Sequence, residues 1–189
     1  MLKSTKKIII IQIITFLIIC GIICIFATSS PNNWFIDDTL YANEIAVAAE
    51  KYNLPKEFIR SIVYQESKFN NKAKGKAGEI GLMQVLPRGA VADWARINKK
   101  NVPSKQDLYN PELNLEIGCW YLARSIKKWQ GYSARLELVL VEYNAGPKRA
   151  NEWKPKNKRE VSIVSKIKIP STKKYVSEIL KRYQGYLDK

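Results

Sequence analysis

The chain carries one acidic side chain where a helix would otherwise present only apolar ones. Positions i, i+3, i+4 and i+7 of this stretch are Ile59, Ile62, Val63 and Glu66. That spacing places them on one face of a helix. A carboxylate on an apolar face is costly to bury unpaired, so it either finds a partner or keeps its proton near neutral pH. Because a protonated carboxyl group in a wet cleft is a general acid, Glu66 is a candidate catalytic residue.

The composition narrows the chemistry further. The 189 residues include no histidine, which excludes Ser-His-Asp and Cys-His nucleophile systems and the usual catalytic zinc sites. Acid–base chemistry must then come from Asp, Glu, Lys, Tyr or Cys side chains, and we predict neither a metal site nor a cofactor. Cys20 and Cys24 lie in an N-terminal apolar run, whereas Cys119 stands alone at helical spacing with apolar residues. We interpret Cys119 as a core residue.

The N-terminal segment predicts a membrane anchor. Residues 8–27 are almost wholly apolar and follow Lys3, Lys6 and Lys7. Twenty such residues can span a bilayer, and the preceding lysines favour a cytoplasmic location for residues 1–7. We therefore expect a single transmembrane helix at residues 8–27.

Other interpretations of this segment lead to a similar layout. A cleaved signal peptide is the rival, while a lipoprotein signal at Cys20 is disfavoured because a bulky residue precedes it. After the apolar run, residues 28–39 have the composition of a linker. The anchor and signal interpretations both place the remaining domain, residues 40–189, outside the cytoplasm.

The formal net charge of +15 predicts an anionic partner. A basic surface suits nucleic acid, anionic lipid headgroups or an acidic wall polymer. Because the basic domain is expected outside the cytoplasm, nucleic acid is disfavoured. The sequence does not specify an oligomeric state.

The hydrophobic periodicity predicts a mainly α fold. We expect helices at about 41–52, 55–69, 87–95, 111–130, 133–144 and 170–183. Residues 70–82 are expected to form a loop, with room for a short hairpin, because they hold three glycines. Residues 154–169 are rich in lysine and show no clear period.

Five blocks of residues occur in order across residues 40–185. They are Gln65-Glu66-Ser67-x-Phe69-Asn70, Gly78-x-x-Gly81-Leu82-Met83-Gln84-x-x-Pro87, Asn114-x-x-x-Gly118-x-x-Tyr121-Leu122, Tyr143-Asn144-Ala145-Gly146-Pro147 and Pro170-x-Thr172-x-x-Tyr175-Val176. Each block alone is a weak signal, but the five in this order and spacing are very specific. Together they resemble the catalytic domain of the soluble lytic transglycosylases.

The resemblance implies a lysozyme-like helical domain that cleaves the β-1,4 bond between N-acetylmuramic acid and N-acetylglucosamine in peptidoglycan glycan strands. It implies that Glu66 is the single catalytic acid/base. It also implies a glycan cleft lined by Ser67, Met83, Gln84, Tyr143 and Asn144. With the predicted anchor, such a domain would stand on the periplasmic side of a bacterial cytoplasmic membrane.

One carboxyl group can suffice for this reaction. Glu66 would protonate the leaving glycosidic oxygen and then act as base while the 6-hydroxyl of the muramic acid attacks C1, which gives a 1,6-anhydro sugar. An intramolecular nucleophile has a high effective molarity. Ordinary glycosidases, which use water, need two carboxyl groups.

Three positions depart from the family pattern. Gly75 stands where a serine is common, Glu79 where a small residue usually follows the loop glycine, and Glu142 where an alanine commonly precedes the tyrosine. We interpret both glutamates as solvated surface charges, although either could position a water. The alternatives are therefore a goose-lysozyme-like muramidase that hydrolyses the same bond and an inactive peptidoglycan-binding scaffold. The sequence does not distinguish endo from exo cleavage, or one physiological role from another.

Overall fold

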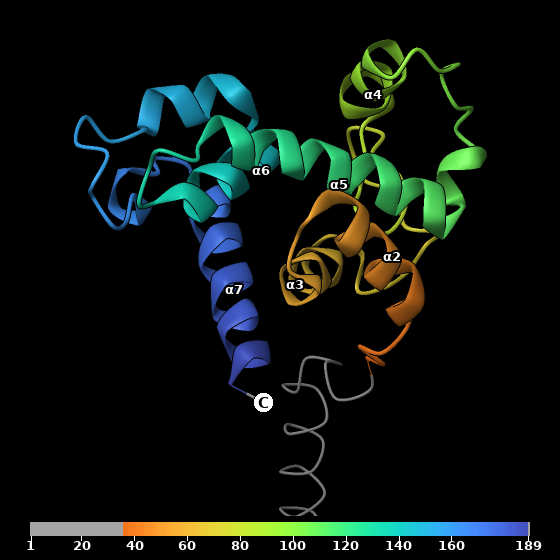
Figure 1. Ribbon diagram of the computed structural model, residues 1–189, viewed down its shortest axis with the longest axis horizontal. Coiled ribbons are helices and arrows are strands. Elements are labelled where there is room, and N and C mark those ends of the chain that lie inside the picture. The colour runs from red at the N-terminus through yellow and green to blue at the C-terminus, as the bar shows by residue number, and fades with distance from the viewer. Residues whose placement is uncertain (1–35, 189) are drawn as a thin grey trace, which may run out of the picture. The chain divides into compact units, whose positions relative to one another are not determined.

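The computed structural model describes residues 36–188 of the chain (Figure 1). The predicted cytoplasmic segment 1–7, the anchor at 8–27 and most of the linker lie outside the described residues. Within residues 36–188, no helix has both the length and the apolar character that a bilayer span requires. This part of the chain is mainly helical and contains no extended strand, which confirms the mainly α prediction.

Helices α2 (Ala42–Tyr52) and α3 (Lys56–Ser67) form the N-terminal part of the domain. Pro55, in an extended conformation, separates them and precedes the first residue of α3. At the other end of α3, Lys68 and Phe69 both adopt positive φ angles, of 54° and 61°. Two consecutive left-handed residues cannot continue a right-handed helix, so α3 stops directly after Ser67 and leaves Glu66 in its last turn.

Helix α5 (Pro111–Lys128) begins with the predicted cap. The Asn110 side chain accepts a hydrogen bond of 2.9 Å from the Leu113 amide, and Pro111 occupies the first helical position. This arrangement satisfies one of the free N–H groups of the first turn. Cys119, in the middle of α5, is fully buried, as predicted.

Helix α6 (Arg135–Trp153) differs from the prediction. We expected a helix that stops at Asn144–Pro147, and the chain does bend at Gly146, whose φ and ψ of 85° and 165° are not helical. Beyond the bend, however, the helix resumes and continues to Trp153. The physical reason is that Pro147 cannot extend the preceding helix but is well suited to the first turn of a new one.

The remaining elements complete the domain. Helix α4 (Ala92–Ile97) follows a tight helical turn at Pro87–Val91, and short 3₁₀ turns occur at Asp107–Tyr109 and Val164–Lys166. Helix α7 (Pro170–Leu187) ends the chain and packs against α3, while α2 packs against α5 (Figure 1). The core thus brings the two ends of the domain together, because α7 contacts one of its first helices.

Two segments between helices are fixed by local bonds. In the first, Ile80 pairs with both Lys74 and Val85 through isolated antiparallel bridges, so the expected loop folds back on itself without forming a strand ladder. In the second, the Glu137 carboxylate accepts hydrogen bonds from the Ser162 hydroxyl and the Ile163 amide. The lysine-rich segment 154–169 is therefore tied to the first turn of α6.

Candidate active site

Glu66 lies where the last turn of α3 meets α7. The Tyr175 hydroxyl, from α7, donates a hydrogen bond of 2.6 Å to Glu66 Oε1. Burial raises the pKa of Glu66 to about 7; the Tyr175 hydrogen bond acts against this rise, and the negative charge of Glu79 adds to it. Glu66 can therefore hold a proton close to neutral pH and release it within the same range, which general acid–base catalysis requires.

The apolar face of α3 supplies the burial that raises this pKa. Ile59, Ile62 and Val63 are fully buried, as the helical period predicts. Among residues 36–188, Glu66 forms no ion pair. Its close polar partner is a phenol rather than a cation, so nothing nearby strongly favours the ionised carboxylate.

A groove of about 370 Å³ lies next to Glu66. Its walls come from the loop before α4, from α4 and α5, and from the two sides of the bend in α6. The lining residues are Glu79, Gln84, Val85, Leu86, Gly89, Ala90, Asp93, Tyr121, Glu142, Tyr143, Asn144, Gly146 and Pro147. Glu66 is not one of these lining residues, but Tyr143 and Glu79, which are, each interact with it electrostatically.

Tyr143 and Asn144 reach the groove from α6, just before its bend. The Tyr143 hydroxyl donates to the Met83 carbonyl at 2.7 Å, and its ring meets the edge of Tyr121 at a centroid distance of 5.8 Å. The Asn144 side-chain oxygen accepts a hydrogen bond of 2.8 Å from the Thr172 hydroxyl on α7. Both predicted site residues are therefore held from a second element and both line the groove.

Gln84 lines the groove from the loop before α4. Its φ of 45° is unusual for a residue with a side chain. The conformation is stabilised because its side-chain nitrogen donates to the carbonyls of Ala73, at 3.2 Å, and Gly81, at 2.9 Å. The side-chain nitrogen of Gln84 is therefore already hydrogen-bonded within its own loop.

Met83 and Ser67 are placed differently from the other predicted site residues. The Met83 side chain is fully buried against α5, so close to Gly118 that a Cβ there would lie 2.3 Å from its sulfur. Ser67 is 8% exposed, and its hydroxyl donates to the Val63 carbonyl within α3. Met83 therefore contacts the site residue Tyr143 through its backbone carbonyl and not through its side chain. The Ser67 hydroxyl is used in a hydrogen bond within α3.

Asn114 is a buried residue that braces the site and was not among the predicted site residues. Its side-chain oxygen accepts from the Met83 amide at 2.8 Å, and its nitrogen donates to the carbonyls of Ile80, at 2.8 Å, and Leu108, at 2.7 Å. A Cβ on Gly81 would lie 2.2 Å from this nitrogen. Asn114 is the first residue of the third sequence block, and this was the sequence signal that it belongs to the site.

Glu142 corrects one sequence prediction. We expected a solvated surface charge, but Glu142 is buried, with 7% of its surface exposed. Its Oε2 atom lies 2.6 Å from Lys128 Nζ and accepts a hydrogen bond of 2.8 Å from the Trp129 indole. Both partners stand at the end of α5. A buried carboxylate needs such partners to remain charged, and the pair was invisible in the sequence because it joins two helices.

Sequence reasoning also missed Tyr175 as a site residue. The periodicity assigned it to the core face of the last helix, and it is indeed 6% exposed. Its hydroxyl nevertheless contacts Glu66 across 109 positions of the sequence. The Tyr175-Val176 pair in the fifth block was the only sequence signal for this role.

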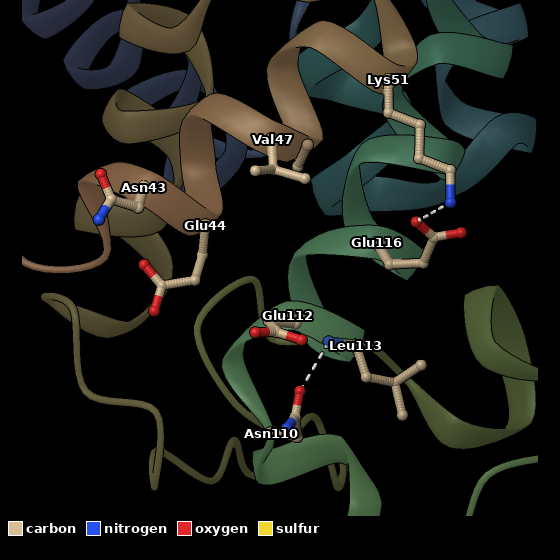
Figure 2. Close-up of a pocket in the computed structure, with 9 residues that line it drawn as sticks. Asn43, Glu44, Val47, Lys51, Asn110, Glu112, Leu113 and Glu116 are labelled. Carbon is tan, nitrogen blue, oxygen red and sulfur yellow. Dashed lines mark hydrogen bonds and ion pairs between the residues drawn. The ribbon is translucent and has the colours of Figure 1, made fainter.

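A larger hollow, of about 760 Å³, lies between α2 and α5, and Figure 2 shows it. Its walls carry Glu44, Glu112 and Glu116. Lys51 Nζ lies 2.6 Å from Glu116 Oε2, and the Tyr52 hydroxyl donates to Glu116 Oε1 at the same distance. A carboxylate with a cationic partner is held in its charged form. Glu116 is therefore a poor candidate for a general acid, despite the size of the hollow that it lines.

The family model for the transglycosylase SLT domain matches residues 43–164, which is more than half of the chain. The chain belongs to this family. The matched part of the SLT domain contains Glu66, the groove residues and Asn114, whereas Tyr175 and Thr172 lie beyond it, on α7.

Individual relatives and solved structures agree with this assignment. Over 86 residues the chain is 45% identical to membrane-bound lytic murein transglycosylase E of Buchnera aphidicola, covering 45% of this chain and 39% of the relative. Over 136 residues it is 30% identical to the soluble lytic murein transglycosylase of Escherichia coli, covering 70% of this chain and 20% of the relative. The lytic transglycosylase Slt of Pseudomonas aeruginosa has a similar structure, with a TM-score of 0.69 and 26% identity, over 79% of this chain and 25% of that one. The chain thus matches two fifths or less of the length of these proteins.

Proposed function

We propose that this chain is a peptidoglycan lytic transglycosylase that cleaves the MurNAc-β-1,4-GlcNAc bond and leaves 1,6-anhydro-MurNAc ends. The observation that carries the proposal is Glu66, a carboxyl group without a cationic partner whose pKa is raised to about 7 beside a groove. The lytic murein transglycosylases among its relatives support the reaction class. One similar structure is of a Pseudomonas Slt variant inactivated by exchange of a glutamate for glutamine.

In the first step, Glu66 gives its proton to the glycosidic oxygen of the leaving sugar. Burial makes this transfer possible near neutral pH, because the protonated form is still populated there. As the proton leaves, the Tyr175 hydroxyl remains hydrogen-bonded to Oε1 and stabilises the carboxylate that forms. Tyr175 thus stabilises Glu66 during the part of the reaction in which Glu66 is ionised.

In the second step, the Glu66 carboxylate takes the proton of the muramic acid 6-hydroxyl while that oxygen bonds to C1. The proton balance closes, because the same carboxyl group that donated a proton receives one. The nucleophile belongs to the substrate, so the protein needs to orient the sugar rather than activate a water. The Oε2 atom of Glu142 accepts hydrogen bonds from Lys128 and Trp129, so this carboxyl group already has a structural role.

Within this scheme, Gln84, Tyr143 and Asn144 bind the glycan through the groove that they line. Ser67 and Met83 act indirectly. The Met83 carbonyl positions the Tyr143 hydroxyl, and Ser67 stabilises the last turn of α3. Asn114 braces the loop before α4, from which Gln84 reaches the groove. The site needs no metal ion, and within residues 36–188 no cluster of His, Cys, Asp or Glu side chains could hold one.

We further propose that residues 8–27 anchor the catalytic domain, residues 40–189, on the periplasmic side of the bacterial cytoplasmic membrane, with residues 1–7 in the cytoplasm and residues 28–39 as a linker. The apolar run and its preceding lysines support this topology, and membrane-bound lytic murein transglycosylases occur among the relatives. The charge of +15 suits an enzyme held close to anionic lipid and wall polymers.

Mass spectrometry of digested peptidoglycan tests the proposed reaction. Purified full-length protein should release muropeptides with 1,6-anhydro ends, and the Glu66→Gln variant should release none. Reducing ends in place of anhydro ends would identify a muramidase instead. Retention on peptidoglycan without any release by the wild type would identify a binding scaffold.

A further inference from the structure

The groove is lined by acidic residues although the chain as a whole is basic. Three carboxyl groups line it, those of Glu79, Asp93 and Glu142, and none of its lining residues is a lysine or an arginine. The whole chain, by contrast, has 32 Lys and Arg residues against 17 Asp and Glu residues. Salt screens exposed charges beyond about 8 Å, so the groups that line the groove decide which charge it binds.

Glu79 differs from the other two acidic residues of the groove. Glu142 pairs with Lys128 at 2.6 Å. Asp93 pairs with Arg96 at 2.8 Å. Within the described part of the chain, Glu79 forms no ion pair. The groove therefore contains one negative charge without a countercharge, at position 79.

The carboxyl group of Glu79 is held in place by its own loop. The Ala77 amide donates a hydrogen bond of 2.9 Å to Glu79 Oε2. The Gly75 amide donates to the backbone carbonyl of Glu79, also at 2.9 Å, and closes the turn between them. Among residues 36–188, no donor binds the second carboxyl oxygen, Oε1. Glu79 thus presents a free acceptor from a fixed turn.

The side chain of Gln84 brings a second acceptor close to Glu79. The position that a Cβ of Gly75 would take lies 2.1 Å from Glu79 Oε2 and 2.9 Å from Gln84 Oε1, so these two oxygens are neighbours. The side-chain nitrogen of Gln84 donates to two backbone carbonyls of the loop, and these bonds fix which end of the amide is oxygen. Both residues line the groove.

Two neighbouring acceptors, one of them charged, suit a ligand that is cationic and carries only donors. A primary ammonium group has three N–H donors and no acceptor, and its hydrogen bond to a carboxylate is charge-assisted. An anion would meet only acceptors here. A metal ion is disfavoured, because within the described residues no three acidic or sulfur side chains come together to hold one.

Resting on the proposed function, we propose that Glu79 and Gln84 bind an ammonium group of the peptidoglycan substrate, so that the enzyme prefers glycan strands with free amines. Two groups in peptidoglycan have this chemistry. One is the amine of an amino sugar that lacks its N-acetyl group, and the other is the free side-chain amine of a diamino acid in an uncrosslinked stem peptide. Acetylation removes the charge of either amine and leaves Glu79 without a partner.

The test measures binding without turnover, in full-length protein that carries Glu66→Gln. Soluble glycan strands are prepared with free amines on the sugars alone or on the stem peptides alone, and each preparation is compared with its acetylated form. Calorimetry at about pH 6, where the amines are protonated, should give a Kd about three- to fivefold lower for the free amine in one of the two pairs. The pair that shows this preference identifies the source of the ammonium group.

Adding Glu79→Gln should reduce this ratio of Kd values to about one. The glutamine keeps the shape of the side chain and an oxygen that can accept from the Ala77 amide, and it removes the charge. The ratio compares two ligands on the same variant, so a fraction of unfolded protein does not change it.

Glu112→Gln is the matched control. It is the same substitution with the same change in net charge, but Glu112 lines the hollow between α2 and α5 and not the groove. Within residues 36–188, Glu112 also forms no ion pair. This variant should keep the preference for free amines.

Three outcomes would overturn the inference. They are equal affinity for the free and acetylated forms in both pairs, a preference that survives Glu79→Gln, and a preference that Glu112→Gln also abolishes. Failure of the proposed function is distinguishable, because it would appear in the products that the wild type releases, whereas the calorimetry measures binding to a variant without turnover.

Discussion

Two carboxyl groups in the described chain, those of Glu116 and Glu66, have surroundings that shift their pKa values in opposite directions. Between α2 and α5, Glu116 pairs with Lys51 at 2.6 Å, as Figure 2 shows, and accepts a hydrogen bond of 2.6 Å from Tyr52. These hydrogen bonds lower the pKa of Glu116 despite partial burial. At the end of α3, Glu66 has a tyrosine alone and its pKa rises to about 7. The difference is one cation, which Glu116 has as a partner and which Glu66 lacks among the described residues.

The comparison teaches that the partners of a carboxyl group, rather than the size of the cavity, indicate its chemistry. The hollow of about 760 Å³ is twice as large as the groove of about 370 Å³. Its Glu116 nevertheless has a lysine partner, and its pKa is lowered. Cavity volume alone would therefore not lead to Glu66.

The largest expected effect appears when Glu66 and Glu116 are each replaced by glutamine. Glu66→Gln should reduce the release of muropeptides on the order of 10³-fold, because the variant can neither donate nor accept the proton. Glu116→Gln removes the same group from the other hollow and should leave the rate unchanged. Initial rates on purified peptidoglycan measure both, and equal losses in the two variants would refute the distinction.

The pH dependence of the wild-type rate sharpens the comparison. Only protonated Glu66 can begin the reaction, and its pKa is about 7. Activity should therefore fall by about tenfold per pH unit above that value. Initial rates between pH 5 and 9 give the profile, and a rate that still rises at pH 9 would contradict the assignment of Glu66 as the acid.

Tyr175→Phe tests in which direction the alkaline limb of this pH profile moves. It removes a hydrogen bond that favours the ionised Glu66, so the alkaline limb should move to higher pH. The same initial rates, repeated for this variant, measure the shift.

The smallest expected effect concerns stability, and its sign differs between the two regions. Glu66 has a raised pKa in the folded protein. Its ionisation therefore lowers the free energy of unfolding once the pH exceeds 4.5, the pKa in the unfolded chain, and this loss levels off above about 7. Glu66→Gln should therefore be more stable than wild type by about 3 kcal/mol at pH 8. Near pH 4 the difference should vanish.

The variant in the other hollow should show the opposite sign. The lowered pKa of Glu116 means that its charged form contributes stability above its unfolded pKa, and this contribution is lost as the pH falls. Glu116→Gln should be less stable by about 0.5–1 kcal/mol at pH 8. Urea unfolding of both variants at pH 4 and pH 8 checks the pair, and a shared sign at pH 8 would contradict the comparison.

The sequence predicted much of this molecule because its signals are local. The apolar face that ends in Glu66 follows from the helical period, and the cap at Asn110-Pro111 follows from side-chain chemistry. The five blocks of residues predicted the family. Each of these needs only residues within about two turns of a helix, or the order of short motifs.

The remainder depends on which surfaces meet, and that is a tertiary property. The bond from Tyr175 to Glu66 crosses 109 positions, and Glu142 finds its partners on a different helix. Met83 illustrates a further limit: the sequence block marks the residue without showing that its carbonyl, rather than its side chain, reaches Tyr143. A motif identifies positions, and packing decides which atoms they present.

The amide of Asn114 has a consequence for motion. It joins three stretches of chain, at Ile80–Met83, at Leu108 and in α5, through hydrogen bonds that are all buried. None of these stretches can open without breaking a bond of the same side chain, so they form one cooperative unit. Hydrogen exchange at the Met83 amide would therefore report the opening of all three stretches together, and not a local fluctuation of one loop.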